Sequence, residues 1–263
     1  MKLVYIVSWL FALAVSFVSC DDWLDKTPKD RLYPDVYFKT EDELRLFTNQ
    51  FYNNLVPSAV DIYSESSDLI VKSDLMLEMS GQRIIPDEGN GWNFTALRDI
   101  NFYLQYSHNC TEVNARNRYD GVARFFRAYF YFEKVKRYGD IPWYDKALDS
   151  DDPELYKARD SREFVMQKML EDLDFAIANL PKTKNAYVLT RWTALALKSR
   201  VCLFEGTFRK YHGLEDCEKY LNACVSASET FMNESGYTLY KSGSTPYRDL
   251  FASINLQADE VIF

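Results

Sequence analysis

Residues 119–138 read YDGVARFFRAYFYFEKVKRY, and this stretch decides the fold class. Apolar and aromatic side chains recur along it at the three- and four-residue spacing of one helix face. Basic residues gather toward its C-terminal half, where they complement the helix dipole. Gly139 suits a left-handed position after the last turn, and Pro142 stops the helix from continuing. The stretch predicts a long helix with most of these aromatic side chains in the core: Phe125, Phe126, Tyr129, Phe130 and Phe132.

Similar patterns predict five more helices. Thr40 with Glu43 forms a capping box, Thr190 is placed to cap a later helix, and Asp160 with Glu163 opens the helix before it. The expected ranges are about 40–55, 92–106, 160–180, 190–208 and 216–232. Successive amphipathic helices with short polar links favour antiparallel hairpins stacked as an α-solenoid. We therefore expect an all-α dominated, tetratricopeptide-like helical-hairpin solenoid with irregular loops, the longest over 58–91.

Composition narrows the class of partner. The chain has 263 residues and a formal net charge of −8 without a basic block, which argues against nucleic-acid binding. Aromatic residues make up 16% while there are only 9 glycines, so many short strands are disfavoured and the aromatic excess is expected mainly in helix packing. The final residues, DEVIF at 259–263, predict a strand that begins there, and we expect the chain to be truncated before a C-terminal part.

The first twenty residues, MKLVYIVSWLFALAVSFVSC, have the layout of a secretory signal. Lys2 supplies the positive start, and the apolar run is shorter than the roughly 20 residues of a comfortable membrane span. Ser19-Cys20 looks like a bacterial lipobox, in which Cys20 is lipidated after cleavage. The alternative is a plain signal peptide cleaved near Ser19. The expected organisation is a lipoprotein signal peptide over 1–19 and a helical domain over 20–263.

The other reactive side chains carry no strong motif. Cys217 and Cys224 stand two helical turns apart, roughly 10 Å, which is too far for a disulfide and typical of small buried side chains. His108 and His212 lack metal-ligand spacing, so neither a metal nor a cofactor is expected. The acidic run at 149–154 reads as a solvated linker. Paired carboxylates for glycoside hydrolysis have no visible support.

Several blocks, in this order along the chain, resemble the N-terminal part of SusD/RagB-family outer-membrane lipoproteins. The most specific are RAYFYF at 127–132 and YGDIPW at 138–143, although the family usually has phenylalanine where Tyr138 stands. Further blocks are CDDWLD at 20–25, FKTED at 38–42, RWTALA at 191–196 and EVIF at 260–263. The resemblance runs across essentially the whole chain.

The resemblance implies a function. Proteins of this family lie on the outer face of the outer membrane in Bacteroidetes, held by a lipid anchor. They bind glycans, and occasionally other nutrients, and act as a lid over a SusC-like TonB-dependent transporter, and they are not enzymes. Their tetratricopeptide-like helices form a scaffold, and a more irregular part supplies much of the ligand site.

Sugar binding requires an exposed aromatic platform beside planar hydrogen-bonding groups. The segment GQRIIPDEGNGWN at 81–93 offers both, and its candidate glycan contacts are Trp92, Arg83, Asn90 and Asn93. The alternative for Trp92 is a packing role at the start of a helix. Two other functions also stay open. A tetratricopeptide-type protein-interaction lipoprotein would have no saccharide affinity, and a lipid-anchored glycoside hydrolase would turn a polysaccharide over.

Overall fold

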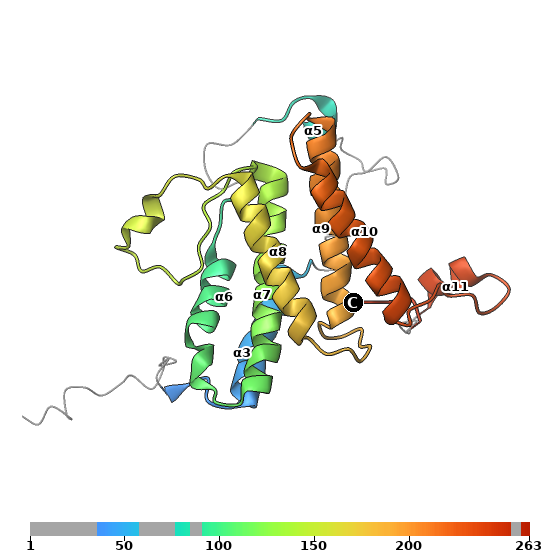
Figure 1. Cartoon of the computed structure of the whole chain (residues 1–263), viewed down its shortest axis with the longest axis horizontal. Helices are drawn as coiled ribbons and strands as arrows, with labels where there is room; N and C mark the ends of the chain where they lie inside the picture. Colours follow the sequence, from blue (N-terminus) through green and yellow to red (C-terminus); the bar gives the residue numbers. More distant parts are fainter. Residues whose placement is uncertain (1–35, 58–76, 85–90, 254–258) are drawn as a thin grey trace, which may run out of the picture. The chain divides into compact units, whose positions relative to one another are not determined.

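The computed structural model of the chain describes residues 36–57, 77–84, 91–253 and 259–263 (Figure 1). The chain divides into the units Met1–Tyr37 and Phe38–Phe263, and the fold below is that of the second unit. The predicted signal peptide (1–19), the predicted lipidation site Cys20 and the candidate contact Asn90 lie outside the described residues.

Helices and short turns of 3-10 helix make up the regular structure of the described part of this unit, together with one isolated bridge between Ile141 and Asp160. The α-helices are α3 (Glu41–Leu55), α5 (Leu77–Ser80), α6 (Thr95–Tyr106), α7 (Val113–Tyr138), α8 (Arg162–Asn179), α9 (Arg191–Tyr211), α10 (Cys217–Glu234) and α11 (Pro246–Ala252). The 3-10 turns are η2 (Ser107–Asn109) and η3 (Pro153–Tyr156). The predicted all-α class is confirmed.

Helices that follow one another in sequence pack against one another. Helix α7 packs on α8, α8 on α9, and α9 on α10, while α3 and α6 pack together against α7 (Figure 1). This succession of helical hairpins is the tetratricopeptide-like arrangement that the sequence predicts. None of the described helices is both long enough and apolar enough to span a membrane.

Side-chain caps fix where several helices begin. Thr40 and Glu43 form the predicted capping box of α3, with Glu43 Oε2 accepting the Thr40 N–H at 3.0 Å. Thr190 caps α9 as predicted. The predicted opening of α8 at Asp160 is wrong, because Ser161 caps that helix. The Asp160 carboxylate instead accepts the Trp143 N–H at 2.7 Å, which holds it in the preceding loop.

Two helix starts differ from the prediction. Helix α6 begins at Thr95 rather than Trp92, because Asn93 Oδ1 accepts the Thr95 N–H at 2.8 Å and leaves Trp92 outside the helix. Helix α7 begins at Val113, six positions before the predicted Tyr119. Its first turns are polar and carry no side-chain cap, so neither periodicity nor capping marks them in the sequence.

The aromatic side chains of α7 form much of the core, as predicted. Phe125, Phe126, Phe130 and Phe132 are buried, and Tyr129 is half-buried. Burying one such side chain stabilises a fold by about 1.5–3 kcal/mol, so the aromatic face of this helix contributes substantially to the core. Gly139 follows the helix with φ +71°, a conformation that favours glycine. The aromatic excess of the chain is therefore mainly packing.

Two further expectations need correction. The predicted strand at 259–263 is absent from the structure described there, where a turn is followed by residues without regular secondary structure. Asp259 O accepts the Thr238 N–H at 2.9 Å, but no ladder of such bonds continues along these residues. Cys217 and Cys224 are free, as expected, yet they are half-buried rather than buried.

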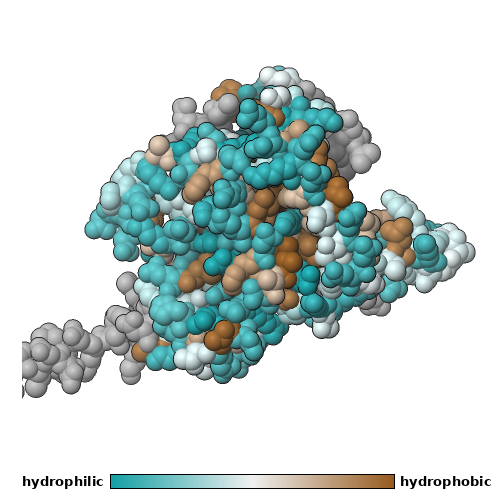
Figure 2. Space-filling model, viewed as in Figure 1, coloured by the Kyte–Doolittle hydropathy of each residue, from teal (hydrophilic) through white to brown (hydrophobic). Residues whose placement is uncertain are grey.

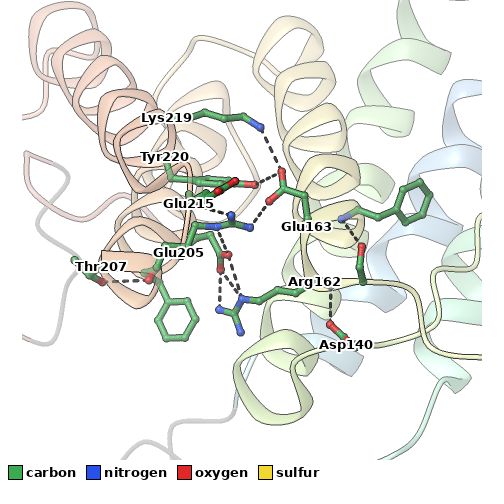
Figure 3. Close-up of polar contacts among 12 residues, drawn as sticks. Asp140, Arg162, Glu163, Glu205, Thr207, Glu215, Lys219 and Tyr220 are labelled. Atoms are coloured by element: carbon green, nitrogen blue, oxygen red, sulfur yellow. Dashed lines mark hydrogen bonds and ion pairs between the residues drawn. The ribbon is translucent and has the colours of Figure 1, made fainter. Parts of the chain in front are cut away.

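An ion network joins α8, α9 and α10 (Figure 3). Glu205 of α9 is fully buried and binds Arg162 of α8 at 2.7 Å and Arg209 of its own helix at 2.8 Å. Arg209 also pairs with Glu163 of α8, which accepts a hydrogen bond from Tyr220 of α10 at 3.2 Å. Because every buried charge has an opposite partner, the network can hold the three helices in register.

Candidate functional site

A cavity of about 560 Å³ opens between the N-terminal part of α6 and the loop that connects α7 to α8, a volume in the usual range of small-molecule sites. We name it the Trp92 cavity, and the loop over residues 139–160 the 139–160 loop. The cavity is lined by Trp92, Phe94, Thr95, Leu97, Arg98, Asn101, Pro142, Tyr144, Lys146, Leu148, Leu155, Lys157, Ala158 and Arg159.

Trp92 is the largest aromatic side chain in this lining and is 39% exposed. Its ring meets Tyr138 edge-on at 4.9 Å between ring centres and Phe94 at 5.3 Å. The guanidinium of Arg159 lies 4.9 Å from the centre of the Trp92 ring, within cation–π distance. Packing therefore fixes the ring, and part of its surface stays open to a ligand.

The backbone before Trp92 depends on glycine. Gly91 has φ +83°, which L side chains rarely adopt. A Cβ atom built there would lie 3.3 Å from Arg137 Nη1 and from the Tyr138 hydroxyl. Lys134 of α7 donates a hydrogen bond to Gly91 O, and burial lowers the pKa of this lysine. Helix α7 thus sets the position from which Trp92 enters the cavity.

Hydrogen bonds fold the 139–160 loop back onto α7. The Tyr131 hydroxyl accepts the Tyr144 N–H at 2.6 Å, and its ring stacks on Trp143 at 4.2 Å between centres. Burial raises the pKa of Tyr131 above its usual range, so the hydroxyl keeps its proton. Asp160 accepts the Trp143 N–H, and Lys157 donates to Trp143 O at 2.6 Å. These bonds join Trp143, near the start of the loop, to Lys157 and Asp160 at its end.

Asn101 connects this loop to the helical core. Its Nδ2 donates to Tyr144 O at 2.8 Å and to Lys146 O at 3.3 Å, both on the cavity side of the loop. Its Oδ1 accepts a hydrogen bond from Arg127 Nη1 at 3.2 Å. Arg127 makes a bidentate pair with Asp172 of α8, with both contacts at 2.7 Å. Burial works to lower the pKa of Arg127, but the Asp172 carboxylate holds it above its usual range.

Every charged side chain in the described lining of the cavity is basic. Lys146 binds Asp152 at 3.2 Å and Glu154 at 3.1 Å, and hydrogen bonds to these carboxylates raise its pKa. Arg98 Nε donates to Leu148 O at 3.3 Å. The lining thus combines aromatic rings with N–H donors, the groups that cover a sugar ring and bond its oxygens.

The four candidate contacts fall in different places. Trp92 lines the cavity. Asn93 is exposed, lines an adjacent cavity, and uses its Oδ1 to accept the Thr95 N–H. Arg83 is exposed and is not part of the Trp92 cavity lining, while Asn90 lies outside the described residues. The glycan contacts of these residues stay predictions.

Sequence reasoning missed the other wall of the cavity. Tyr144, Lys146, Lys157 and Arg159 come from the 139–160 loop, about fifty positions or more beyond Trp92. The basic residues in the loop are the signal that could have drawn attention to it. The acidic run at 149–154 has a structural role here, since Asp152 accepts the Glu154 N–H at 2.9 Å and both carboxylates bind Lys146. Over the described ranges, no cluster of three or more potential metal ligands occurs.

Three curated proteins of similar sequence are described as SusD-like proteins. The SusD-like protein P2 of Formosa agariphila is 27% identical over 218 residues, which are 75% of this chain and 43% of that protein. Across three curated relatives from this organism, the chain spans 39% to 51% of their length.

Solved structures share the fold. A SusD-like protein of Bacteroides fragilis superposes with a TM-score of 0.61 at 21% identity, covering 86% of this chain and 44% of that one. A structure described as a laminarin-binding SusD-like protein gives a TM-score of 0.52 at 18% identity, covering 65% of this chain and 35% of that one. A family model described as SusD-like, starch-binding and associating with the outer membrane matches residues 58–191, just over half of the chain. The chain belongs to the SusD-like family.

Proposed function

We propose that this chain is part of a cell-surface glycan-binding lipoprotein that captures oligo- or polysaccharide and delivers it to a SusC-like TonB-dependent transporter. In this proposal, residues 1–19 are a lipoprotein signal peptide and 20–263 belong to the mature protein. Cys20 carries the lipid anchor that holds the protein on the outer face of the outer membrane. The protein binds its glycan without hydrolysing it.

The Trp92 cavity is the observation that carries the proposal. It offers the open part of the Trp92 ring and the Tyr144 ring beside guanidinium and ammonium donors. Aromatic surface covers the apolar face of a sugar, and N–H donors bond its hydroxyl and ring oxygens. The family membership and the laminarin-binding relative support the same ligand class.

A protein partner alone is the second candidate function. Large apolar side chains are exposed on the helices of the solenoid, among them Leu203 of α9 and Val225 of α10. Figure 2 shows apolar residues gathered over the α8–α10 region on a face that is otherwise mostly hydrophilic. Exposed apolar surface of this kind suits a docked protein. Such a protein would show no saccharide affinity.

Affinity electrophoresis tests which function holds. The full-length protein is run through gels that contain laminarin, xyloglucan or polygalacturonic acid, and the same mixtures are assayed for released reducing ends. The proposal expects retardation by at least one polysaccharide and no release. If none of the three polysaccharides retards the protein, the protein-interaction function is favoured. Released reducing ends would favour the hydrolase.

The anchor has its own test. Cys20→Ala removes the thiol that would be acylated, and each buried CH₂ of an acyl chain contributes about 0.8 kcal/mol to membrane binding. The variant is expected in the soluble fraction, whereas Ser19→Ala, which keeps a small residue before the cysteine, stays in the outer-membrane fraction. Retention of Cys20→Ala in the outer membrane would contradict lipid anchoring at this residue.

A further inference from the structure

We propose that the Trp92 cavity selects anionic glycans, and that Arg98 and Arg159 bind a carboxylate on a sugar residue of the uronic-acid type. This inference rests on the proposed glycan-binding function and narrows its ligand class. It follows from the distribution of charge in the cavity.

The cavity is basic in a chain that is acidic. The chain carries a formal net charge of −8, yet the charged residues of the described lining are Arg98, Lys146, Lys157 and Arg159. Charges more than about 8 Å away are largely screened at physiological ionic strength. A ligand inside the cavity therefore responds to these four cations and to the carboxylates paired with them, and not to the distant acidic residues of the chain.

Two of these cations are already neutralised by the protein. Lys146 binds Asp152 and Glu154, and Lys157 binds Asp160 at 3.0 Å. These pairs brace the 139–160 loop, so the two lysines have a structural function that accounts for them. They do not by themselves call for an anionic ligand.

The two arginines differ from the lysines. Among the residues that the structure describes, no Asp or Glu side chain makes an ion pair with Arg98 or Arg159. Arg98 Nε donates to Leu148 O, a neutral partner that holds its guanidinium at the cavity wall. Arg159 lies over Trp92. Within the described part of the chain, neither guanidinium is therefore neutralised by a direct ion pair, although the charge of Arg98 acts on the neighbouring Asp99 carboxyl.

A carboxylate on a sugar fits this arrangement. The planar guanidinium fork matches the planar carboxylate in two parallel hydrogen bonds, and these charge-assisted bonds are roughly twice as strong as neutral ones. Arg159 next to Trp92 would place such a bond beside the ring that covers the sugar. A neutral glycan would offer the two guanidinium groups hydroxyl oxygens but no charged partner.

Matched ligands test the inference on the full-length protein. Isothermal titration is carried out with polygalacturonic acid and with its methyl-esterified form, which keeps the sugar backbone but removes the charge. Alginate supplies a second uronic-acid polymer, λ-carrageenan supplies sulfate instead of carboxylate, and laminarin and xyloglucan are neutral. The inference expects tighter binding of at least one uronic-acid polymer, by about tenfold over its neutral counterpart, with affinity that falls as salt rises.

Variants locate the effect. Arg159→Gln and Arg98→Gln keep a polar side chain but remove the charge, and each is expected to weaken binding of the uronic-acid polymer about tenfold. Arg45→Gln is the matched control, since Arg45 is an exposed arginine paired with Asp42 on α3, away from the cavity. The thermal midpoint of each variant is measured in parallel, because an arginine that serves only the fold would lower stability without changing selectivity.

The outcomes separate the two proposals. Binding to neutral glycans alone, or equal binding of the acidic and esterified polymers, would overturn the selectivity and leave glycan binding intact. Preference for λ-carrageenan over the uronic-acid polymers would overturn the carboxylate and assign sulfate. Unchanged selectivity in both arginine variants would also overturn the inference. Binding to none of these polymers would contradict the proposed function itself.

Discussion

Asn101 links the buried ion pair between α7 and α8 to the wall of the Trp92 cavity. Its oxygen accepts from Arg127, and its amide nitrogen donates to the backbone of the 139–160 loop. Arg127 is 7% exposed and Asp172 is 2% exposed, so their charges depend on each other rather than on water. A substitution at Asp172 is therefore expected to change both the free energy of unfolding and the position of the 139–160 loop.

Asp172→Asn tests this connection. The substitution leaves the Arg127 guanidinium buried without a countercharge, which is expected to lower the free energy of unfolding by about 3 kcal/mol. The matched control is Asp174→Asn, two positions along α8, where the carboxylate that pairs with Lys198 is itself exposed and a surface pair contributes about 0.5 kcal/mol. Urea unfolding measures both. Equal, small effects of the two substitutions would contradict the role given to the buried pair.

The contacts among Asn101, Arg127 and Asp172 could not be predicted from the sequence. The spacing of apolar residues marks Arg127 as one of the polar positions on its helix, but it does not reveal that the side chain is buried. Its partner Asp172 stands 45 positions away, and Asn101 stands 26 positions away in the other direction. Only the packing of three helices brings them together. In contrast, Phe126 and Phe130 stand four positions apart, at helical spacing, and their burial is predictable for that reason.

At the scale of the helix, local signals predicted most of the structure. The Thr40 and Thr190 caps stand next to the helices that they begin, so the sequence alone identifies them. The 139–160 loop had no such signal, because part of its backbone is held by Asn101 and Tyr131, which belong to other elements. Part of the candidate site therefore escaped prediction, whereas Trp92, next to the start of α6, did not.

The ion network of α8, α9 and α10 makes the stability of the fold depend on pH. Burial works to raise the pKa of Glu163, but Arg209, Lys219 and Tyr220 together hold it below its ordinary value of 4.5. A carboxyl group with a lowered pKa in the folded state stabilises the fold above its unfolded pKa. That contribution is lost as the pH falls from 4.5 through the lower folded value.

Glu163→Gln is expected to lower the thermal midpoint at neutral pH, and the gap to the wild-type protein should close as the pH falls below 4.5 and through the lower folded pKa of Glu163. Glu171→Gln on the same helix is the control, since Glu171 interacts at the surface with Lys168 and Gln167 and should shift the midpoint little at any pH. Thermal unfolding followed by circular dichroism across the pH series measures both. A gap for Glu163→Gln that stays constant with pH would contradict the lowered pKa.

At the scale of the whole molecule, the helices act as a scaffold for a small site at one loop. Helix α7 supplies core aromatic side chains along its length. Its Lys134 holds the backbone of Gly91 by a hydrogen bond, and its Tyr131 anchors the 139–160 loop. The chain spans at most about half the length of the curated relatives that it matches, so the activity of the whole protein is a proposal. The central claim of that proposal is glycan capture at the Trp92 cavity.

Isothermal titration of Trp92→Ala tests this claim most directly. The ligand is the polysaccharide that retards the full-length protein most among laminarin, xyloglucan and polygalacturonic acid. The control is Tyr211→Ala, an exposed aromatic residue at the end of α9, outside the cavity. We expect Trp92→Ala to weaken binding at least about tenfold, because the largest aromatic surface in the lining is lost, while Tyr211→Ala binds as the wild-type protein does. Wild-type affinity in a folded Trp92→Ala variant would contradict the account.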